Sequence, residues 1–496
     1  MPSIPFTRKA GDGGACAVLI GIGDGSFLRD VIECYERVVV ICLPGETPSK
    51  DHPHSVHQYI VRGAQDAAEV ISHAFAKQAH IVELESTDFY SKHPSPCDPQ
   101  VRQDFALLFY NLLSQRPFTL GDDIIDGLQG AYHIAMSAHK LVGAPTPDEL
   151  PKLSCPVLAV APGPSLVKYI DAIKALQNKC LIICADTALE GLLRAGITPH
   201  MVTPLERVPQ VVDESFPRSN YPGIIFAGTP VVHHHIADKF HRHLFVPGSD
   251  SLFLWAGAKQ EQLFFYGQST GVLAATLGTR LTTGLVYLVG HDLAFNDTAS
   301  HWDAVHQGVQ LGDEVVRFEV DGNGGGKVLS QSWWHIFKNE LAELARETKR
   351  IVNINGVTND GAAIADTFAS PLPESCNLPD FVMPPWPAEN TARKERLATL
   401  LGELPSDLRR IMTGLSRSNL RMVDIDYRAL CTTDNRLMIS YISRSAMGQF
   451  GMQYQNGASD AQTAADYSDT IRNVYRQLMP MCEQMADAPL CQAVHV

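Results

Sequence analysis

The sequence lacks the features that define several classes of protein. It has no low-complexity tract and no C-x-x-C pair, and its eleven cysteines are scattered along the chain. The first residues, M-P-S-I-P-F-T-R-K-A-G, lack the apolar core of a signal peptide. Cysteines without a pairing pattern are typical of a reducing compartment, and Cys180 and Cys184 lie in an apolar run. We therefore expect a cytoplasmic protein with buried, free thiols.

Basic residues are also scarce, with 40 Lys and Arg against 54 Asp and Glu, for a formal net charge of -14. Nucleic-acid binders concentrate positive charge, and no basic stripe is present. The fairly apolar stretch 271–290 contains Arg280 together with several Thr and Gly, so it divides better into a helix and a strand than into a membrane span. The sequence predicts no nucleic-acid partner and no membrane span.

The 496 residues are too many for one ordinary core, and their pattern changes along the chain. Short apolar strands alternate with helical stretches in the first two regions, and the last region has a helical period. We predict an α/β protein: a doubly wound, Rossmann-like central domain with a smaller α/β N-terminal domain and an all-α C-terminal domain. The predicted boundaries are 1–150, 151–370, a proline-rich linker at 371–390, and 391–496.

The central domain has the clearest alternation of strands and helices. The predicted strands are 156–161, 180–185, 200–203, 223–227, 285–290 and 351–354. The predicted helices are 165–177, 187–195, 269–283 and 331–348.

The N-terminal region opens with A-V-L-I-G-I-G-D-G, a strand that runs into Gly21, Gly23 and Gly25. Further strands are predicted at 38–43 and 80–84. The glycines hint at a bound dinucleotide, but their spacing does not follow the full fingerprint.

Polar side chains gather where the central strands end. The stretch L-A-V-A-P-G-P-S-L-V (158–167) ends a strand in Gly163 and Ser165, and the next strands end in Asp186 and Thr203. Each hydroxyl or carboxyl could simply cap a helix. Because ligands bind outside the carboxyl ends of parallel strands, several such residues together favour a polar pocket. We predict that Gly163 allows close backbone approach and that Ser165 begins an anion-binding helix.

Two other groups of residues have a possible metal-binding composition. His233, His234, His235, His241 and His243 crowd one segment, but consecutive histidines do not point the same way on a regular element and no cysteine is near. The acid pair Asp424 and Asp426 lies far from every predicted strand end. We therefore predict no metal site.

An ordered series of blocks in the central domain resembles the motility accessory factor (Maf) family, which is implicated in flagellin glycosylation. The blocks are A-P-G-P-S-L (161–166), C-A-D-T-A-L (184–189), G-I-T-P-H-M-V-T-P-L-E (196–206), G-Q-S-T-G-V (267–272), V-Y-L-V-G-H-D-L-A-F (286–295) and T-N-D-G-A-A-I (358–364).

The Maf family in turn is similar to bacterial sialyltransferases that carry G-N-G-P-S-L at the first strand end. The resemblance implies a glycosyltransferase that uses a CMP-activated nonulosonic (sialic-acid-like) sugar, inverts the anomeric centre, needs no metal or cofactor, and modifies Ser or Thr of flagellin. From the strand ends together with this resemblance, the predicted substrate-binding residues are Gly163, Ser165, Asp186, Thr203, Glu206, Ser269, Thr270 and Asn355.

This chain departs from the sialyltransferase pattern at the catalytic base. Pro162 replaces the asparagine of the first block, Ala294 and Phe295 replace paired tyrosines, and Val328-Leu329-Ser330 stands where those enzymes have the catalytic histidine. The loop after Gly290-His291-Asp292 contains His301, whose imidazole suits proton abstraction at neutral pH. We predict His301 and Asp292 as catalytic residues, with His291 packed and His306 solvated.

Two alternatives remain open at this point. Hydroxymethylpterin pyrophosphokinases share the G-P-S-L style of domain and would use ATP and Mg²⁺, for which Asp186, Glu206 and Asp292 could serve as ligands. The chain could also be a non-catalytic flagellin-binding factor with a degenerate pocket.

Overall fold

The computed structural model consists of two compact units. One comprises Met1–Asp123 with Val315–Phe318 and Met447–Thr463, and the other comprises the remainder of the chain. The structure describes residues 16–23, 25–35, 37–48, 56–62, 87–90, 97–99, 101–102, 105, 124–296, 300–302, 317–417, 433–439, 476 and 478–490.

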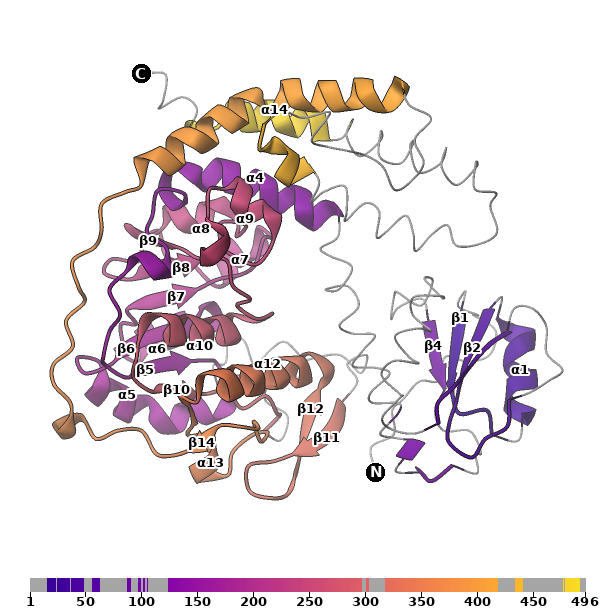
Figure 1. Cartoon of the computed structure of the whole chain (residues 1–496). Helices are drawn as coiled ribbons and strands as arrows, with labels where there is room; N and C mark the ends of the chain where they lie inside the picture. Colours follow the sequence, from indigo (N-terminus) through magenta and orange to yellow (C-terminus); the bar gives the residue numbers. More distant parts are fainter. Residues whose placement is uncertain are drawn as a thin grey trace. The chain divides into compact units, whose positions relative to one another are not determined.

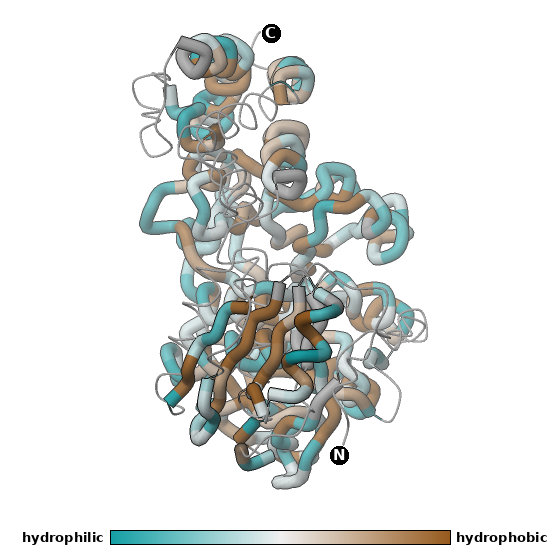
Figure 2. The backbone as a smooth tube through the Cα atoms, turned by 90° about the vertical axis from the view of Figure 1, so that its right-hand side faces the viewer, coloured by the Kyte–Doolittle hydropathy of each residue, from teal (hydrophilic) through white to brown (hydrophobic). Residues whose placement is uncertain are grey.

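The N-terminal unit contains a parallel four-stranded sheet of order β3-β2-β1-β4. Its first two strands along the chain are apolar along much of their length, and brown segments of this sheet are visible in Figure 2. The predicted first two strands are confirmed, whereas the one predicted at 80–84 lies outside the described residues. The elements are β1 (Cys16–Ile20), α1 (Ser26–Cys34), β2 (Arg37–Cys42), β3 (Val56–Ile60) and β4 (Thr87–Tyr90).

The larger unit is built on an eight-stranded parallel sheet of order β14-β13-β10-β5-β6-β7-β8-β9 (Figure 1). This confirms the predicted Rossmann-like α/β fold and all six predicted strands, but the sequence analysis missed β9 and β14. The strands are β5 (Val157–Val160), β6 (Leu181–Ala185), β7 (Met201–Thr203), β8 (Ile225–Gly228), β9 (Arg242–Phe245), β10 (Val286–Val289), β13 (Ile351–Asn353) and β14 (Phe368–Ala369).

The strand order reverses beside β5. The chain runs outward from β5 through β6, β7 and β8 to β9, and then returns to place β10 on the other side of β5. In an open α/β sheet the connections leave a crevice at such a reversal, outside the carboxyl ends of the strands. The fold therefore puts a crevice next to the residues that follow β5 and β10.

Alternating side chains of the strands enter two different core clusters. Leu158 and Val160 of β5 join the cluster that contains the apolar faces of the helices after β5, β6 and β8, while Val157 and Ala159 join the cluster on the other face. Cys180 and Cys184 are fully buried, as predicted. Burial raises the pKa of Cys180 to about 12, so this thiol is unreactive at neutral pH.

The helices of the larger unit cover both faces of the sheet. The helix predicted at 165–177 is a 3-10 turn that continues into α5, and the other three predicted central helices are confirmed. The helices and turns are α4 (Ile124–Leu141), η1 (Pro147–Glu149), η2 (Pro164–Tyr169), α5 (Ile170–Leu176), α6 (Asp186–Arg194), α7 (Gln210–Glu214), α8 (His234–Asp238), α9 (Ser251–Trp255), η3 (Gln260–Gln262), α10 (Thr270–Leu281), α12 (Ser332–Thr348) and α13 (Asn355–Thr358). A two-stranded sheet of β11 (Arg317–Asp321) and β12 (Lys327–Gln331) precedes α12.

The contacts divide the chain at different residues from those predicted. Helix α4 belongs to the unit of the central sheet, whereas the sequence analysis assigned residues up to 150 to the N-terminal domain. Residues 391–446 belong to the same unit as well, so the C-terminal helix is not a separate compact body. Among the residues that the structure describes, no helix combines the length and apolarity needed to cross a membrane.

The proline-rich stretch 371–390 has no regular element except η4 (Ser375–Asn377). It nevertheless packs along the larger unit: the Phe381 backbone nitrogen donates to Asn178 O at 2.7 Å, and Lys179 pairs with Asp380 at 2.8 Å. The long helix α14 (Thr391–Arg417) follows, and its buried Arg393 pairs with Glu149 at 2.6 Å. The predicted linker is therefore a strap that is fixed to the protein at its middle and just beyond its C-terminal end.

Candidate functional site

A cavity of about 510 Å³ lies at the carboxyl ends of β5, β6, β7 and β10, where the strand order reverses. This volume is typical of small-molecule sites. Among its lining residues are several of those predicted from the sequence: Gly163, Asp186, Glu206, Ser269, Thr270, Asp292 and His301.

The turn after β5 is shaped by its contact with the turn after β10. A Cβ atom on Gly163 would lie 2.3 Å from the backbone oxygen of Gly290, and the Gly163 nitrogen donates to that oxygen at 2.8 Å. Pro164 then begins η2 with a fixed φ angle. Gly163 thus allows two backbone turns to approach each other, a role different from the predicted close approach to a ligand.

Asp292 occupies the helix end that the sequence analysis assigned to an anion. Its carboxylate accepts hydrogen bonds from the Ser165 nitrogen at 2.6 Å, from the Ser165 hydroxyl, and from Asn355 Nδ2 at 2.6 Å. Burial raises the pKa of Asp292, and these donors act in the opposite direction. Ser165 and Asn355 are buried and are not among the cavity's lining residues. They hold Asp292, and Asp292 connects β10 to β5.

Thr203 has a similar internal role. Its side chain is fully buried, and its hydroxyl is 3.1 Å from Cys184 O and 2.9 Å from Thr270 O. It is not among the lining residues of the cavity. Thr203 therefore connects the ends of β6 and β7 to the first turn of α10.

Asp186 begins α6 directly at the end of β6 and lines the cavity. Its Oδ1 accepts a hydrogen bond of 2.8 Å from the Thr187 nitrogen. Burial raises the pKa of Asp186 to about 6, and the nearby Glu206 carboxylate contributes in the same direction. A carboxylate with this pKa can take up a proton near neutral pH, which gives Asp186 an acid–base capacity that its sequence position did not reveal.

The N-terminus of α10, from Ser269 to Val272, lines the cavity. Ser269 is its N-cap, since its Oγ accepts from the Val272 nitrogen at 3.1 Å. Gly271 packs closely, because a Cβ there would lie 3.3 Å from His291 Nε2. The amides of a twelve-residue helix offer partial positive charge to an anionic ligand.

The two histidines near this end differ in environment. His291 is 3% exposed, its Nε2 lies 3.2 Å from Gly271 O, and burial lowers its pKa to about 4. It is packed, as predicted. His301 is half-buried in the cavity wall, with Nδ1 2.8 Å from the Ser300 hydroxyl. The backbone nitrogen of Trp302 donates to Pro162 O at 2.9 Å, which connects this loop to the end of β5. His306 lies outside the described residues.

One side of the cavity is aromatic, which was not predicted from the sequence. Trp334 and Phe337 from α12 line it, and the Trp334 ring lies 4.5 Å from the Phe295 ring, centroid to centroid. Flat aromatic surfaces pack well against a nucleobase or a sugar face. The signal was the S-W-W-H-I-F sequence at the start of a predicted helix, whose orientation the sequence could not reveal.

The glycine-rich turn of the N-terminal unit is filled by a side chain of the protein itself. The Glu46 carboxylate accepts hydrogen bonds from the nitrogens of Ile22 at 2.8 Å, Gly23 at 3.1 Å and Leu43 at 2.8 Å. Gly21, with φ +93°, would bring a Cβ to within 3.0 Å of that carboxylate. The amides that would bind a phosphate are therefore already used, which argues against a dinucleotide site there.

The comparisons with known proteins agree with this fold. A family model described as 6-hydroxymethylpterin diphosphokinase MptE-like matches residues 133–298. No curated protein matches the sequence. Among solved structures, the chain is similar to the MAf glycosyltransferase from Magnetospirillum magneticum AMB-1, with a TM-score of 0.50 and 18% identity over 95% of this chain and 79% of that chain. The fold implied by the Maf resemblance is thereby confirmed.

Proposed function

We propose that this chain is a glycosyltransferase of the Maf type, which transfers a nonulosonic sugar from a CMP-activated donor to Ser or Thr of flagellin. The observation that carries the proposal is the cavity at the reversal of the strand order, which combines helix amides, an aromatic side and a carboxyl group of raised pKa. The fold match over 95% of the chain supports it.

The donor would lie between two kinds of surface. The amides at the start of α10, around Ser269 and Thr270, suit the phosphate of CMP because they carry partial positive charge. Trp334 and Phe337 offer a flat apolar surface for the cytosine ring. In this proposal the amides stabilise the departing phosphate, so that no divalent metal is needed.

The reaction is an inverting displacement. The acceptor hydroxyl oxygen forms a bond to the anomeric carbon as the bond from that carbon to the phosphate oxygen breaks, and CMP leaves with the electron pair. The hydroxyl proton passes to a base in the cavity wall. His301 is the base in this proposal and Asp186 is the second candidate, since both line the cavity. Asp292 is a positioning residue, because its hydrogen bonds with Ser165 and Asn355 hold the turn after β10 against the turn after β5.

A second candidate function has its own support. The MptE-like model covers β5 to β10, and Asp186 and Glu206 in the cavity wall are carboxylates of the kind that hold Mg²⁺ under ATP. Under this alternative the chain would transfer pyrophosphate from ATP to a pterin alcohol.

Calorimetric titration of the full chain with CMP and with ATP, each with and without Mg²⁺, distinguishes the two functions. The glycosyltransferase proposal expects CMP to bind equally well with and without Mg²⁺, and expects weak or no binding of ATP. Binding of ATP that requires Mg²⁺, together with no binding of CMP, would overturn it in favour of the pyrophosphokinase.

A further inference from the structure

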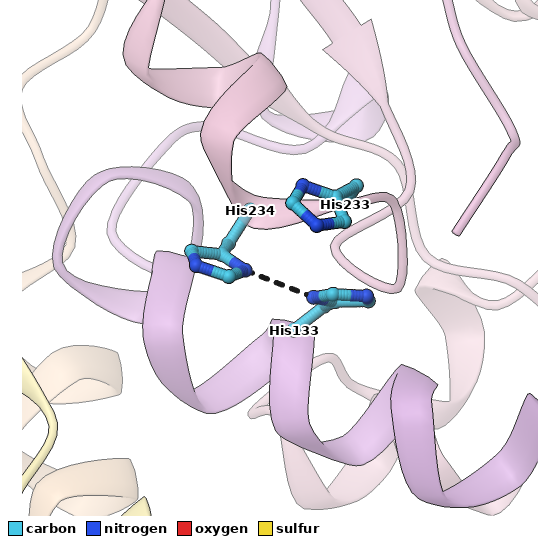
Figure 3. Close-up of side chains that lie close together, drawn as sticks. All are labelled: His133, His233 and His234. Atoms are coloured by element: carbon cyan, nitrogen blue, oxygen red, sulfur yellow. Dashed lines mark hydrogen bonds between the residues drawn. The ribbon is translucent and has the colours of Figure 1, made fainter. Parts of the chain in front are cut away.

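Three histidines from two helical segments meet outside the cavity (Figure 3). His133 comes from α4, and His233 and His234 come from the start of α8. One ring nitrogen of each lies within 4.8 Å of one from each of the others, and the Nδ1 atoms of His133 and His234 are 3.0 Å apart. None of the three is among the lining residues of the cavity.

The tautomer of His133 is fixed by a backbone group. Its Nε2 lies 3.0 Å from Arg207 O, and a carbonyl oxygen can only accept, so Nε2 carries the proton. Nδ1 then carries the lone pair and lies 3.0 Å from His234 Nδ1. A ring nitrogen that donates to a backbone carbonyl while the other faces outward is the usual arrangement of a metal-binding histidine.

The other two rings complete the set. His233 is 9% exposed, and its Nδ1 has no hydrogen-bond partner among the described residues. Burial lowers the pKa of His133 to about 3 and that of His234 to about 4, so both rings are neutral at pH 7. The Asp238 carboxylate lies close enough to act on His234 and supplies negative charge nearby.

We propose that His133, His233 and His234 bind a divalent transition-metal ion such as zinc, with water as the fourth ligand. Two nitrogens bound at ~2.1 Å lie at most about 4.2 Å apart, so the observed separations need only small side-chain movements. Imidazole nitrogens suit zinc, copper and nickel, whereas Mg²⁺ prefers oxygen ligands.

The ion has a structural consequence for the cavity. The backbone nitrogen of His233 donates to Glu206 O at 3.2 Å, and the ring Nε2 of His133 donates to Arg207 O. Two of the three histidines are thus hydrogen-bonded to the loop that carries Glu206 and Val208 into the cavity wall. Metal binding therefore fixes α4 and α8 to each other and stabilises this loop. The metal itself lies outside the cavity and takes no part in the reaction.

Metal titration of the full chain, purified without a histidine tag, tests the proposal. After chelator treatment and dialysis, we expect one Co²⁺ per chain, with ligand-field absorption typical of nitrogen ligands, and one competing Zn²⁺ with a Kd of about 1 µM or tighter. His133→Gln and His233→Gln should each weaken binding about 100-fold or more. His241→Gln is the matched control, because His241 is exposed in the same segment, and it should bind as the wild type does.

A second measurement uses only the wild type, so it tests the site even if the variants fail to fold. Oxidation with Cu²⁺ and ascorbate, followed by peptide mapping, should modify the three histidines of the cluster and spare His241. Failure of the wild type to bind Co²⁺ or Zn²⁺, equal loss of binding in His241→Gln, or oxidation without preference for the cluster would each overturn the site. None of these outcomes depends on CMP binding, so a failure of the metal site can be distinguished from a failure of the proposed function.

Discussion

The carboxylate of Asp292 lies 2.6 Å from the backbone nitrogen of Ser165, so the turn after β10 is hydrogen-bonded to the turn after β5. Both turns line the cavity, at the point where the strand order reverses. The shape of the cavity floor therefore depends on a carboxylate that is itself held by Ser165 and Asn355.

We expect Asp292→Asn to lower the free energy of unfolding by about 2 kcal/mol or more, because an amide group would face donors and leave some of them unsatisfied. Urea denaturation of the full chain measures this change. Asp321→Asn is the control: Asp321 pairs with Lys327 at 2.7 Å in an exposed position, so its loss should leave the stability nearly unchanged. Equal stability of both variants would contradict the structural role of Asp292.

Glu340 should make stability depend on pH. It is half-buried on α12 and accepts from the Gln268 nitrogen at 3.1 Å, and burial raises its pKa to about 7. The folded protein therefore holds a proton that the unfolded chain releases near pH 4.5, so this group's contribution to stability is fully present below pH 4.5 and is lost as the pH rises through about 7.

Glu340→Gln keeps the acceptor and removes the charge. The variant should match the wild type near pH 4.5 and exceed it in melting temperature by a few degrees at pH 8. Glu343→Gln, exposed on the same helix and paired with Arg346, should show no such pH-dependent gain. A gain that is the same at both pH values would argue against a raised pKa.

Ser269→Ala tests the start of α10 as a phosphate site. We expect CMP binding to weaken about fivefold, as for the loss of about 1 kcal/mol of hydrogen bonding. Stability should fall by a similar amount, because the Val272 nitrogen loses its cap. Calorimetry and thermal melting measure the two effects, and Thr279→Ala, near the other end of α10, should leave CMP binding unchanged. Undiminished CMP affinity in Ser269→Ala would remove this side chain from the site.

His301→Gln tests the base. The variant should bind CMP like the wild type and lower sugar transfer to flagellin about 100-fold or more, the usual worth of a general base. Asp186→Asn is the comparison, because its carboxyl group, with a pKa of about 6, is the second candidate. A wild-type rate in His301→Gln, combined with a 100-fold loss in Asp186→Asn, would move the role to Asp186.

The sequence predicted the central sheet because its strands are continuous apolar runs that end in glycine, proline or small polar residues. Ser269 was predictable as a cap for the same local reason. β9 was missed because its sequence, R-H-L-F, lies within a histidine-rich segment and lacks an apolar run.

The partners of the polar residues could not be predicted, because they depend on distant parts of the chain. Ser165 reaches Asp292, 127 positions away, and Asn355, 190 positions away. Each was expected to touch a ligand, since the sequence shows where a strand ends but not which side chain fills the space beyond it. The histidine cluster was not predicted for the same reason, because His133 lies 101 positions before His234 in the sequence.

The strap at 371–390 limits where the chain can be shortened. Leu372 and Leu378 pack against the core cluster on one side of the central sheet, and Phe381, Met383 and Trp386 pack against the cluster on the other side. A protein truncated at residue 370 would expose these apolar surfaces to solvent and leave Glu149 without Arg393. Such a fragment should aggregate, although the proline-rich composition that follows residue 370 suggests a domain boundary there. A fragment meant to keep the cavity should instead begin near residue 124 and retain both the strap and α14.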